Sequence, residues 1–244
     1  MNYIINYTVL ENKKLNNNTF LLKLKGPTNW IKCGKFLNIL IPNKLLRRPM
    51  SVFEWDKNSL TILYKVVGEG TLYLSTLKKN DKVDILIDLG NSYTIKKDKK
   101  QLVICGGSGI CSVYALLKEL NKNHVETTCV VGFKTKNEVV LEKEIKAACS
   151  KLIVCTDDGT YGFKGNIVDA VKHFKLNDLY FYCCGSTPLM RAVLNTCKNG
   201  QLSLEARMGC GFGACMGCSI KTKQGVKRIC KDGAIFEAKD LYEI

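Results

Sequence analysis

Short runs in which apolar and polar residues alternate fill roughly the first 95 positions of the chain. Each run is bounded by turn residues such as "NNN", "GPTN" and "PNK". Alternation with a period of two is typical of strands that bury one face. The pattern therefore predicts a small antiparallel barrel of six strands. The predicted strands are residues 3–12, 19–26, 35–42, 50–55, 59–67 and 81–90.

From about residue 100 the pattern changes to apolar runs that alternate with helical periodicity. The predicted strands are residues 100–107, 125–133, 151–158 and 178–185, and the predicted helices are residues 112–123, 139–149, 165–174 and 187–197. Strict alternation of strand and helix predicts a parallel sheet covered on both faces, as in nucleotide-binding α/β domains.

The two patterns and the remaining segment predict a multidomain chain of mixed α+β and α/β class. We expect an N-terminal antiparallel β-barrel over residues 1–97 and a central parallel-sheet nucleotide-binding domain over residues 98–200. A small C-terminal module over residues 201–244 is rich in cysteine and glycine.

Composition narrows the class of protein. The 244-residue chain is 46% hydrophobic, yet no apolar stretch approaches the roughly 20 residues that cross a bilayer. The first residues lack the features of a signal peptide, so we expect a cytoplasmic protein without a membrane partner. The formal charge of +15 comes from lysines spread among asparagines and isoleucines, which favours a solvated basic surface over nucleic-acid binding.

The 13 cysteines form two groups. An odd number argues against a disulfide framework, and residues such as Cys105, Cys129 and Cys155 lie singly in apolar runs, where a thiol acts as a small hydrophobe. Only four cysteines, which are Cys210, Cys215, Cys218 and Cys230, cluster with the spacing of ligands.

The spacing of these four, C-x4-C-x2-C followed by a fourth after eleven residues, is that of plant-type 2Fe-2S proteins. The neighbouring glycines allow left-handed backbone and a close approach of amide N–H groups to sulfur. Zinc is the alternative because Cys215 and Cys218 form a C-x2-C pair. Zinc sites usually contain two such pairs, so the spacing favours iron and sulfide.

A flavin site is suggested by "RRPMS" and by the strand and turn "LYKVVGEGT". Arg47 or Arg48 could bind a pyrophosphate. Tyr64 and Lys65 end a strand on which an isoalloxazine could rest, and Gly70 belongs to a turn that opens a helix. A hairpin turn followed by an ordinary surface helix explains the same residues without a ligand.

A pyridine-nucleotide site is suggested by "LVICGGSGICSVY", a strand, a glycine turn and a helix. Gly107, Gly109 and Ser112 give G-x-G-x-x-S, which lacks the third glycine of the usual fingerprint. Cys184 and Gly185 follow a later strand and would lie near the nicotinamide. Glycines that merely shape the turns are an equal alternative. The candidate residues for NAD are Gly106, Gly107, Gly109, Cys184 and Gly185.

The order of these parts resembles the ferredoxin reductase superfamily. Within it, "LLRRPMS", "GEGTLYLS", "TDDGTYGFKG" and "LSLEARMGCGFGACMGCSIK" resemble most closely the electron-transfer subunits of NAD-dependent dihydroorotate dehydrogenases of class 1B. The resemblance covers nearly the whole chain. Three positions depart from the family pattern: Lys65 replaces arginine, "GGSGICSV" replaces a more glycine- and proline-rich loop, and Ser186 replaces proline.

The resemblance implies the cofactors, the reaction and the partner. A separate FMN-containing catalytic subunit would oxidise dihydroorotate in pyrimidine (UMP) biosynthesis, and electrons would pass through the 2Fe-2S cluster and FAD to NAD. Two copies of each subunit would form a heterotetramer, and no residue of this chain would be catalytic. The residues that match the FAD contacts of the family are Arg48, Pro49, Met50, Ser51, Leu63, Tyr64, Lys65, Gly70 and Thr71.

Two other functions fit parts of the sequence. One is the flavin and iron–sulfur subunit of a related NAD(P)H:ferredoxin or sulfide-type reductase complex. The other is a zinc-binding protein whose basic surface contacts nucleic acid.

Overall fold

A computed structural model describes residues 3–97 and 100–242 of the chain. Among these residues, no helix is both long and apolar enough to span a membrane. The chain divides into two compact units, which are described separately below. The first comprises Met1–Ser92, Glu205–Ile220 and Val226–Ala234, and the second comprises Tyr93–Leu204, Lys221–Gly225 and Ile235–Ile244.

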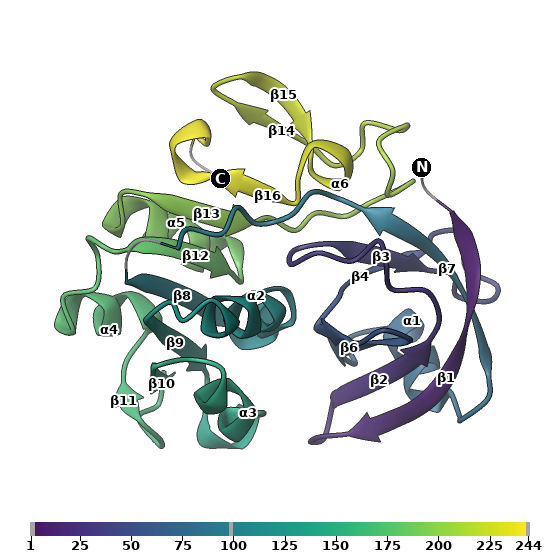
Figure 1. The fold of residues 1–244 in the computed structure, drawn as a ribbon, viewed down its shortest axis with the longest axis horizontal. Helices are drawn as coiled ribbons and strands as arrows, with labels where there is room; N and C mark the ends of the chain where they lie inside the picture. Colours follow the sequence, from purple (N-terminus) through teal and green to yellow (C-terminus); the bar gives the residue numbers. More distant parts are fainter. Residues whose placement is uncertain (1–2, 98–99, 243–244) are drawn as a thin grey trace. The chain divides into compact units, whose positions relative to one another are not determined.

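The first unit is built on a seven-stranded antiparallel sheet with the strand order β4-β3-β7-β1-β2-β6-β5 (Figure 1). Its strands are β1 (Ile4–Lys14), β2 (Thr19–Lys25), β3 (Phe36–Ile39), β4 (Arg48–Ser51), β5 (Glu54–Trp55), β6 (Ser59–Lys65) and β7 (Lys82–Leu89). Tyr7 and Val9 of β1 and Leu22 and Leu24 of β2 are buried in alternation, as the sequence pattern predicts. They belong to one hydrophobic core that the sheet encloses.

The connection between β4 and β5 shows that this sheet closes on itself. The single strand expected over residues 50–55 is wrong, because β4 pairs with β3 whereas β5 pairs with β6. These two strands are the opposite edges of the sheet, yet only the buried residues Val52 and Phe53 separate them. So short a link requires the edges to be close, which confirms the predicted antiparallel barrel.

Helix α1 (Glu69–Thr76) begins at the turn after β6. The Thr71 hydroxyl accepts hydrogen bonds from the backbone N–H groups of Val67 (2.9 Å) and Gly68 (3.2 Å) and donates one to the Gly68 carbonyl (2.9 Å). Leu74 of this helix is fully buried in the barrel core. The helix therefore closes the barrel on one side, and its first turn is fixed locally.

The second unit is built on a seven-stranded sheet with the order β11-β10-β9-β8-β12-β13-β16. All neighbours are parallel except β13 and β16, which are antiparallel. Its strands are β8 (Gln101–Gly106), β9 (Thr127–Phe133), β10 (Lys151–Thr156), β11 (Phe163–Lys164), β12 (Tyr180–Cys184), β13 (Gly200–Ser203) and β16 (Ile235–Glu237). The predicted core of four parallel strands is confirmed, and shorter strands extend it at both edges.

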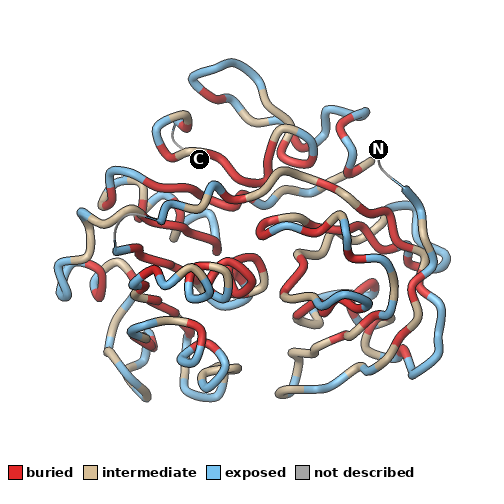
Figure 2. Tube along the Cα trace, in the orientation of Figure 1, coloured by how far each residue is buried: buried red, intermediate tan, exposed pale blue. Residues whose placement is uncertain are grey.

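Helices connect the parallel strands as the alternating pattern predicts. They are α2 (Ile110–Lys122), α3 (Glu142–Ala147), α4 (Ile167–His173) and α5 (Thr187–Thr196), with 3-10 turns η1 (Gly107–Gly109), η2 (Lys136–Glu138) and η3 (Ala238–Asp240). Because such crossovers are right-handed, α2 and α3 cover one face of the sheet, and α4 and α5, which contact each other, cover the other. Most of the strands are buried, as Figure 2 shows.

One predicted helix is only half as long as expected. The pattern over residues 139–149 predicts a full helix, but α3 begins after Leu141, whose φ of +58° is left-handed. The β-branched Val139 and Val140 precede this break and have low helix propensity. The helix therefore starts only with the charged run that follows.

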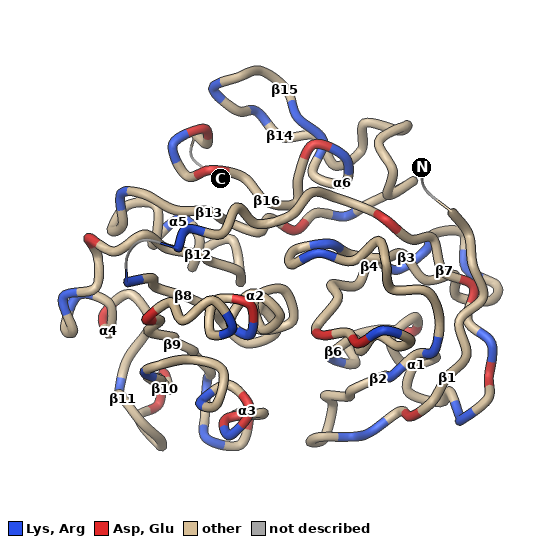
Figure 3. The backbone as a smooth tube through the Cα atoms, viewed as in Figure 1, with Lys and Arg blue, Asp and Glu red and all other residues tan. Residues whose placement is uncertain are grey.

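The last forty or so residues divide between the two units. Strands β14 (Ser219–Thr222) and β15 (Gly225–Arg228) form a hairpin, which is followed by the short helix α6 (Ile229–Asp232). Lysine and arginine are dispersed along both units and are interspersed with acidic residues (Figure 3).

Candidate functional site

The four clustered cysteines lie in two pairs within the first unit. The Cys210 Sγ accepts hydrogen bonds from the backbone N–H groups of Ala214 (3.2 Å) and Cys215 (3.4 Å), and the Cys215 Sγ accepts one from the Cys210 N–H (3.4 Å). The Cys218 Sγ accepts one from the Cys230 N–H (3.4 Å). The predicted ligand set is therefore brought together as Cys210 with Cys215 and Cys218 with Cys230.

The electrostatics of the first and the last of the four thiols differ. Burial raises the pKa of Cys210, but backbone N–H groups of Cys215, Phe212 and Ala214 outweigh it and lower the pKa to about 6. Burial, together with a hydrogen bond and charge repulsion from Cys218, raises the pKa of Cys230 to about 12. A cation would therefore be needed to hold Cys230 as a thiolate.

The paired arrangement fits a two-iron cluster, in which each iron takes two cysteines. Among residues 3–97 and 100–242, no three side chains of His, Cys, Asp or Glu converge on one point as ligands of a single metal ion would. Amide groups aimed at the sulfurs are the second feature that a cluster of net negative charge requires. The donor set and its backbone thus fit a 2Fe-2S group.

Arg228 holds the cysteine loop in place. Its guanidinium donates to the Gly213 carbonyl (2.8 Å) and to the Asp232 carboxylate (3.1 Å), which belongs to α6 beside Cys230. The hydrogen bond that Arg228 donates to Asp232 raises the pKa of Arg228, and the nearby Cys230 and Cys218 contribute to the rise. Arg228 therefore connects the two ends of the ligand set and adds positive charge to the site.

The cysteine segment is also bound to the barrel by backbone contacts. The N–H of Asn91, which follows β7, donates to the Gly233 carbonyl, and the Asn91 side chain donates to the Asp232 carbonyl (3.3 Å). These bonds lie directly beyond α6. These hydrogen bonds fix the position of the cysteine segment on the barrel.

The structure separates the roles of the two arginines that are candidates for a flavin pyrophosphate. The Arg47 guanidinium lies 2.6 Å from the Asp84 carboxylate, so its charge is already paired. The Arg48 side chain instead lies over Gly70 of α1, where a Cβ would come within 2.6 Å of its Nε. Arg48 and the first turn of α1 thus form a cradle, in which the absence of a side chain at Gly70 leaves room for the arginine.

Other predicted flavin residues lie on this cradle or beneath it. Strand β4 carries Arg48 to Ser51, all half-buried. The Tyr64 ring stacks on Phe20 at 5.6 Å within the barrel core, and its hydroxyl donates to Asn12 (3.1 Å). Burial raises the pKa of Tyr64 to about 12. Tyr64 can therefore offer a ligand its backbone but not its ring, and the Thr71 hydroxyl is likewise used within its own turn.

The predicted nucleotide residues converge in the second unit. The loops after β8 and β12 lie at the carboxyl ends of adjacent parallel strands, where the strand order reverses. A Cβ at Gly109 would collide with the Cys184 carbonyl, and one at Gly185 would lie 3.2 Å from the Gly106 nitrogen. Gly107 has a φ of +52°. Such a switch point is where open α/β sheets bind ligands, and its tight packing also explains the glycines.

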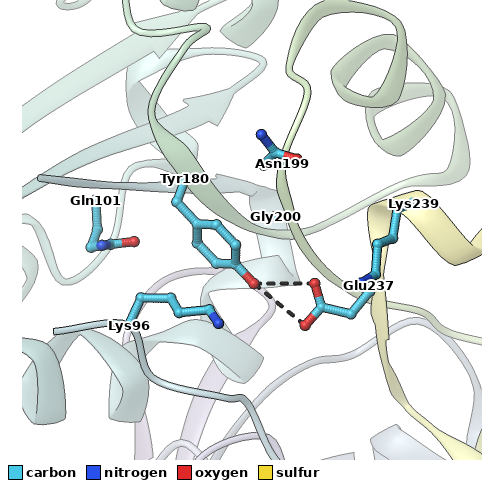
Figure 4. A pocket seen from close by; sticks show the side chains of 7 residues that line it. All are labelled: Lys96, Gln101, Tyr180, Asn199, Gly200, Glu237 and Lys239. Atoms are coloured by element: carbon cyan, nitrogen blue, oxygen red, sulfur yellow. Dashed lines mark hydrogen bonds between the residues drawn. The ribbon is translucent and has the colours of Figure 1, made fainter. Parts of the chain in front are cut away.

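A polar pocket of about 460 Å³, which no sequence pattern predicts, lies near the amino ends of β8, β12 and β13. In Figure 4, the Tyr180 hydroxyl points toward the Glu237 carboxylate, to which it donates at 3.2 Å. Glu237 also accepts a hydrogen bond from Gln201 (2.7 Å). The pocket lies at the opposite end of the strands from the candidate nucleotide loops, so it is a separate feature.

Asn38 and Arg228 are two further residues at the cysteine loop that the sequence pattern does not predict. Asn38 interrupts the apolar run of the strand "KFLNILIP", which marks the residue as unusual but does not indicate what it contacts. Arg228 lies two residues before the fourth cysteine, and only the fold shows that it reaches back to Gly213.

Solved structures define the class to which this architecture belongs. The chain is similar to an NADH-dependent reduced ferredoxin-NADP oxidoreductase studied for flavin-based electron bifurcation, with a TM-score of 0.88 and 26% identity over 97% of this chain and 90% of that one. A ferredoxin NADP+ reductase from Neisseria gonorrhoeae with bound FAD and NADP shares the fold, with a TM-score of 0.67 and 15% identity over 79% and 89% of the two chains. The barrel and the sheet unit together therefore have the fold of the ferredoxin reductase class.

Sequence comparison identifies the family within this class. Residues 205–242 match the model described as the iron-sulfur cluster binding domain of dihydroorotate dehydrogenase B. The electron transfer subunit of dihydroorotate dehydrogenase B (NAD(+)) from Fusobacterium nucleatum is 38% identical over 96% of both chains, and that from Streptococcus mutans is 36% identical over 97% of both. The chain belongs to this family of electron transfer subunits, as the sequence resemblance predicts.

Proposed function

We propose that this protein is the electron-transfer subunit of an NAD-dependent dihydroorotate dehydrogenase and acts in pyrimidine (UMP) biosynthesis. It is an oxidoreductase subunit whose cofactors are FAD and a 2Fe-2S cluster, with NAD as co-substrate. The proposal depends above all on the pairing of the four thiols on a segment that is bound to the barrel. Relatives of the chain are named for this function.

Four residues would hold the cluster: Cys210, Cys215, Cys218 and Cys230. The amides of Ala214, Cys215 and Gly217 point at the sulfurs and would remain as donors to them. A bound 2Fe-2S cluster exchanges single electrons and nicotinamide exchanges pairs, while a flavin can do both.

For FAD we assign the barrel, proposed as residues 1–97, with Arg48 as the cation for the pyrophosphate. Because Arg47 is paired with Asp84, Arg48 is the arginine available beside α1. The backbone of Leu63, Tyr64 and Lys65 would support the ring system. The other proposed contacts are Pro49, Met50, Ser51, Gly70 and Thr71.

For NAD we assign the switch point of the sheet unit, proposed as residues 98–200. Four of the five candidate residues, Gly106, Gly107, Gly109 and Gly185, have no side chain, which lets a nucleotide approach the backbone of their loops. Cys184 is itself buried, so its thiol would not face a ligand.

The partner would be an FMN-containing catalytic subunit that oxidises dihydroorotate. We propose a heterotetramer of two catalytic and two electron-transfer subunits in the cytoplasm. No residue of this chain is assigned as a general acid or base, because the bond-breaking step would take place on the partner.

The decisive experiment is a visible absorption spectrum of anaerobically purified protein, combined with an acid-labile sulfide assay. Flavin bands and two sulfides per chain are expected. A colourless protein with stoichiometric zinc would overturn the proposal and support the zinc-binding alternative.

The flavin assignment can be tested by comparing two neighbouring arginines. Arg48→Ala should release FAD, measured as flavin content after gel filtration, because it removes the guanidinium beside α1. Arg47→Ala should retain FAD and instead destabilise the barrel, because it leaves Asp84 without its partner. Equal flavin loss in both variants would contradict the assignment.

The likeness to the bifurcating ferredoxin-NADP oxidoreductase supports a second candidate, the flavin and iron–sulfur subunit of a related reductase complex. The two candidates differ in their partner. Co-purification with a catalytic subunit and dihydroorotate-dependent reduction of NAD would establish the first, whereas ferredoxin-dependent activity alone would establish the second.

A further inference from the structure

Asn38 is an unpaired carboxamide inside the barrel unit. Its side chain is 1% exposed, and neither its Nδ2 nor its Oδ1 has a hydrogen-bond partner within the described part of the chain. Its neighbours Leu37 and Ile39 face the barrel core, so Asn38 faces outward from the barrel. A carboxamide that is buried without hydrogen-bond partners has lost its hydrogen bonds to water, and no bond within the protein offsets this free-energy cost. Such groups are rare in folded proteins, so each one requires an explanation.

Two candidate sites meet at this residue. In the sheet, Asn38 is paired with Pro49 of β4, the strand assigned to FAD. On its outward face it lies against Gly211, the residue after the first ligand cysteine, where an added Cβ would collide with the Asn38 Nδ2. The carboxamide is therefore aimed at the backbone of the cysteine loop.

The part of the cysteine loop on this side is the backbone around Gly211, which is buried. The Gly213 carbonyl, further along the loop, already accepts a hydrogen bond from Arg228 (2.8 Å). A loop carbonyl that is buried against the barrel requires a donor, and the Asn38 Nδ2 lies against Gly211.

We propose that Asn38 is a positioning residue for the iron–sulfur site, which donates a hydrogen bond to the Cys210–Gly211 backbone when the loop holds its cluster. Asn38 would thereby fix the loop to the strand that is paired with the flavin strand. This inference rests on the proposed function, because it requires a cluster at the four cysteines.

The test compares Asn38→Leu, which keeps the volume, and Asn38→Asp, which keeps the shape but removes the donor. Both are measured in the full-length protein purified anaerobically with its cofactors. The readouts are the rate of cluster loss to a chelator, the reduction potential of the cluster and the FAD content. Leu37→Val, on the opposite face of the same strand, is the control for general weakening of the barrel.

Both variants should lose the cluster about 10-fold faster than the parent protein, as is typical when a residue that supports a metal ligand is removed. The potential of the remaining cluster should shift, because the amides of the loop are less well held against sulfur. FAD content should not change. Thermal stability of the cluster-free Asn38→Leu protein should be unchanged or higher, because an unpaired polar group has been replaced by an apolar one.

Unchanged cluster loss and potential in both variants would overturn the inference, as would a loss of FAD with the cluster intact. A change matched by Leu37→Val would also overturn it. If the parent protein itself contained no labile sulfide, the proposed function would be contradicted. This outcome can be distinguished from the outcomes above, in which the parent protein holds its cluster.

Discussion

The cysteines of this chain occupy two contrasting regions. In the sheet unit, Cys105, Cys129, Cys155 and Cys183 lie on parallel strands and are fully or almost fully buried. In the barrel unit, Cys210 and Cys215 lie on a glycine-rich loop at least partly open to solvent. None of the 13 cysteines, all of which lie in the described part, forms a disulfide.

The difference shows that environment, and not residue type, decides what a thiol does. Burial raises the pKa of Cys155 to about 12, while backbone N–H groups lower that of Cys210 to about 6. A protonated buried thiol is inert filler, whereas a thiolate is a ligand and a nucleophile. The strand backbone uses its amides for the sheet, and the loop backbone has them available for sulfur.

The largest expected effect is the loss of a ligand from the loop. Cys218→Ser should abolish the cluster while some flavin is retained, because the alcohol is a far weaker ligand for iron than a thiolate. Labile sulfide and flavin content measure the two outcomes. A full complement of sulfide in this variant would show that Cys218 is not a ligand.

Thiol alkylation should separate the two regions by several orders of magnitude. In cluster-free folded protein at pH 7, iodoacetamide should modify Cys210 rapidly and leave Cys105 and Cys183 untouched until the protein unfolds. The rate at Cys210 should level off above its pKa of about 6. Peptide mass spectrometry gives the sites, and reaction of the sheet cysteines in the folded state would contradict the comparison.

Loop backbone can be tested with two glycines of similar conformation. Gly213 (φ +94°) packs against the Lys231 side chain near the thiols, whereas Gly225 (φ +96°) faces open space in the hairpin. Alanine at either position should cost about 1–2 kcal/mol of unfolding free energy, because the conformation is unfavourable for a side chain. Only Gly213→Ala should also speed the loss of cluster, and an equal effect from Gly225→Ala would refute a specific role for the loop.

The smallest effect is expected for a sheet cysteine. Cys155→Ala should lower the free energy of unfolding by about 1 kcal/mol at pH 7 and leave flavin and sulfide content unchanged. In the folded protein the Cys155 thiol stays protonated up to about pH 12, whereas the unfolded thiol ionises near pH 9. The folded state thus binds more protons between these values, so its stability falls as pH rises. Removing Cys155 should make this alkaline decline shallower in denaturant titrations.

Much of the fold follows from local pattern. The alternation in β1 and β2 predicts the barrel, and the change of rhythm near residue 100 predicts the parallel sheet, because both depend on residues close in sequence. The break between β4 and β5 cannot be predicted from local pattern, since it arises from the closure of the barrel. Strands β13 and β16 are not predicted either, because each is too short to show a pattern and forms only by pairing with a strand that is distant in sequence.

For the candidate sites, too, the sequence predicts what is local and misses what depends on the fold. Spacing alone predicts the four cysteines, because a cluster restricts the distances between its ligands along the chain. Spacing could not distinguish Arg47 from Arg48, since only the fold brings Asp84 to the first and Gly70 to the second. Asn38 and Arg228 act across the fold, so no local pattern could assign them.

The pairing of β13 with β16 has a consequence for how such a chain can arise and be built. Ser203 is the register partner of Ile235, so the whole thiol-bearing excursion between them leaves the sheet and returns at neighbouring positions. A segment with adjacent ends can be inserted into an existing sheet, or exchanged for a tight turn, at little entropic cost to the host. The cysteine segment can therefore vary in length or content without disturbing the order of the sheet strands on either side of it.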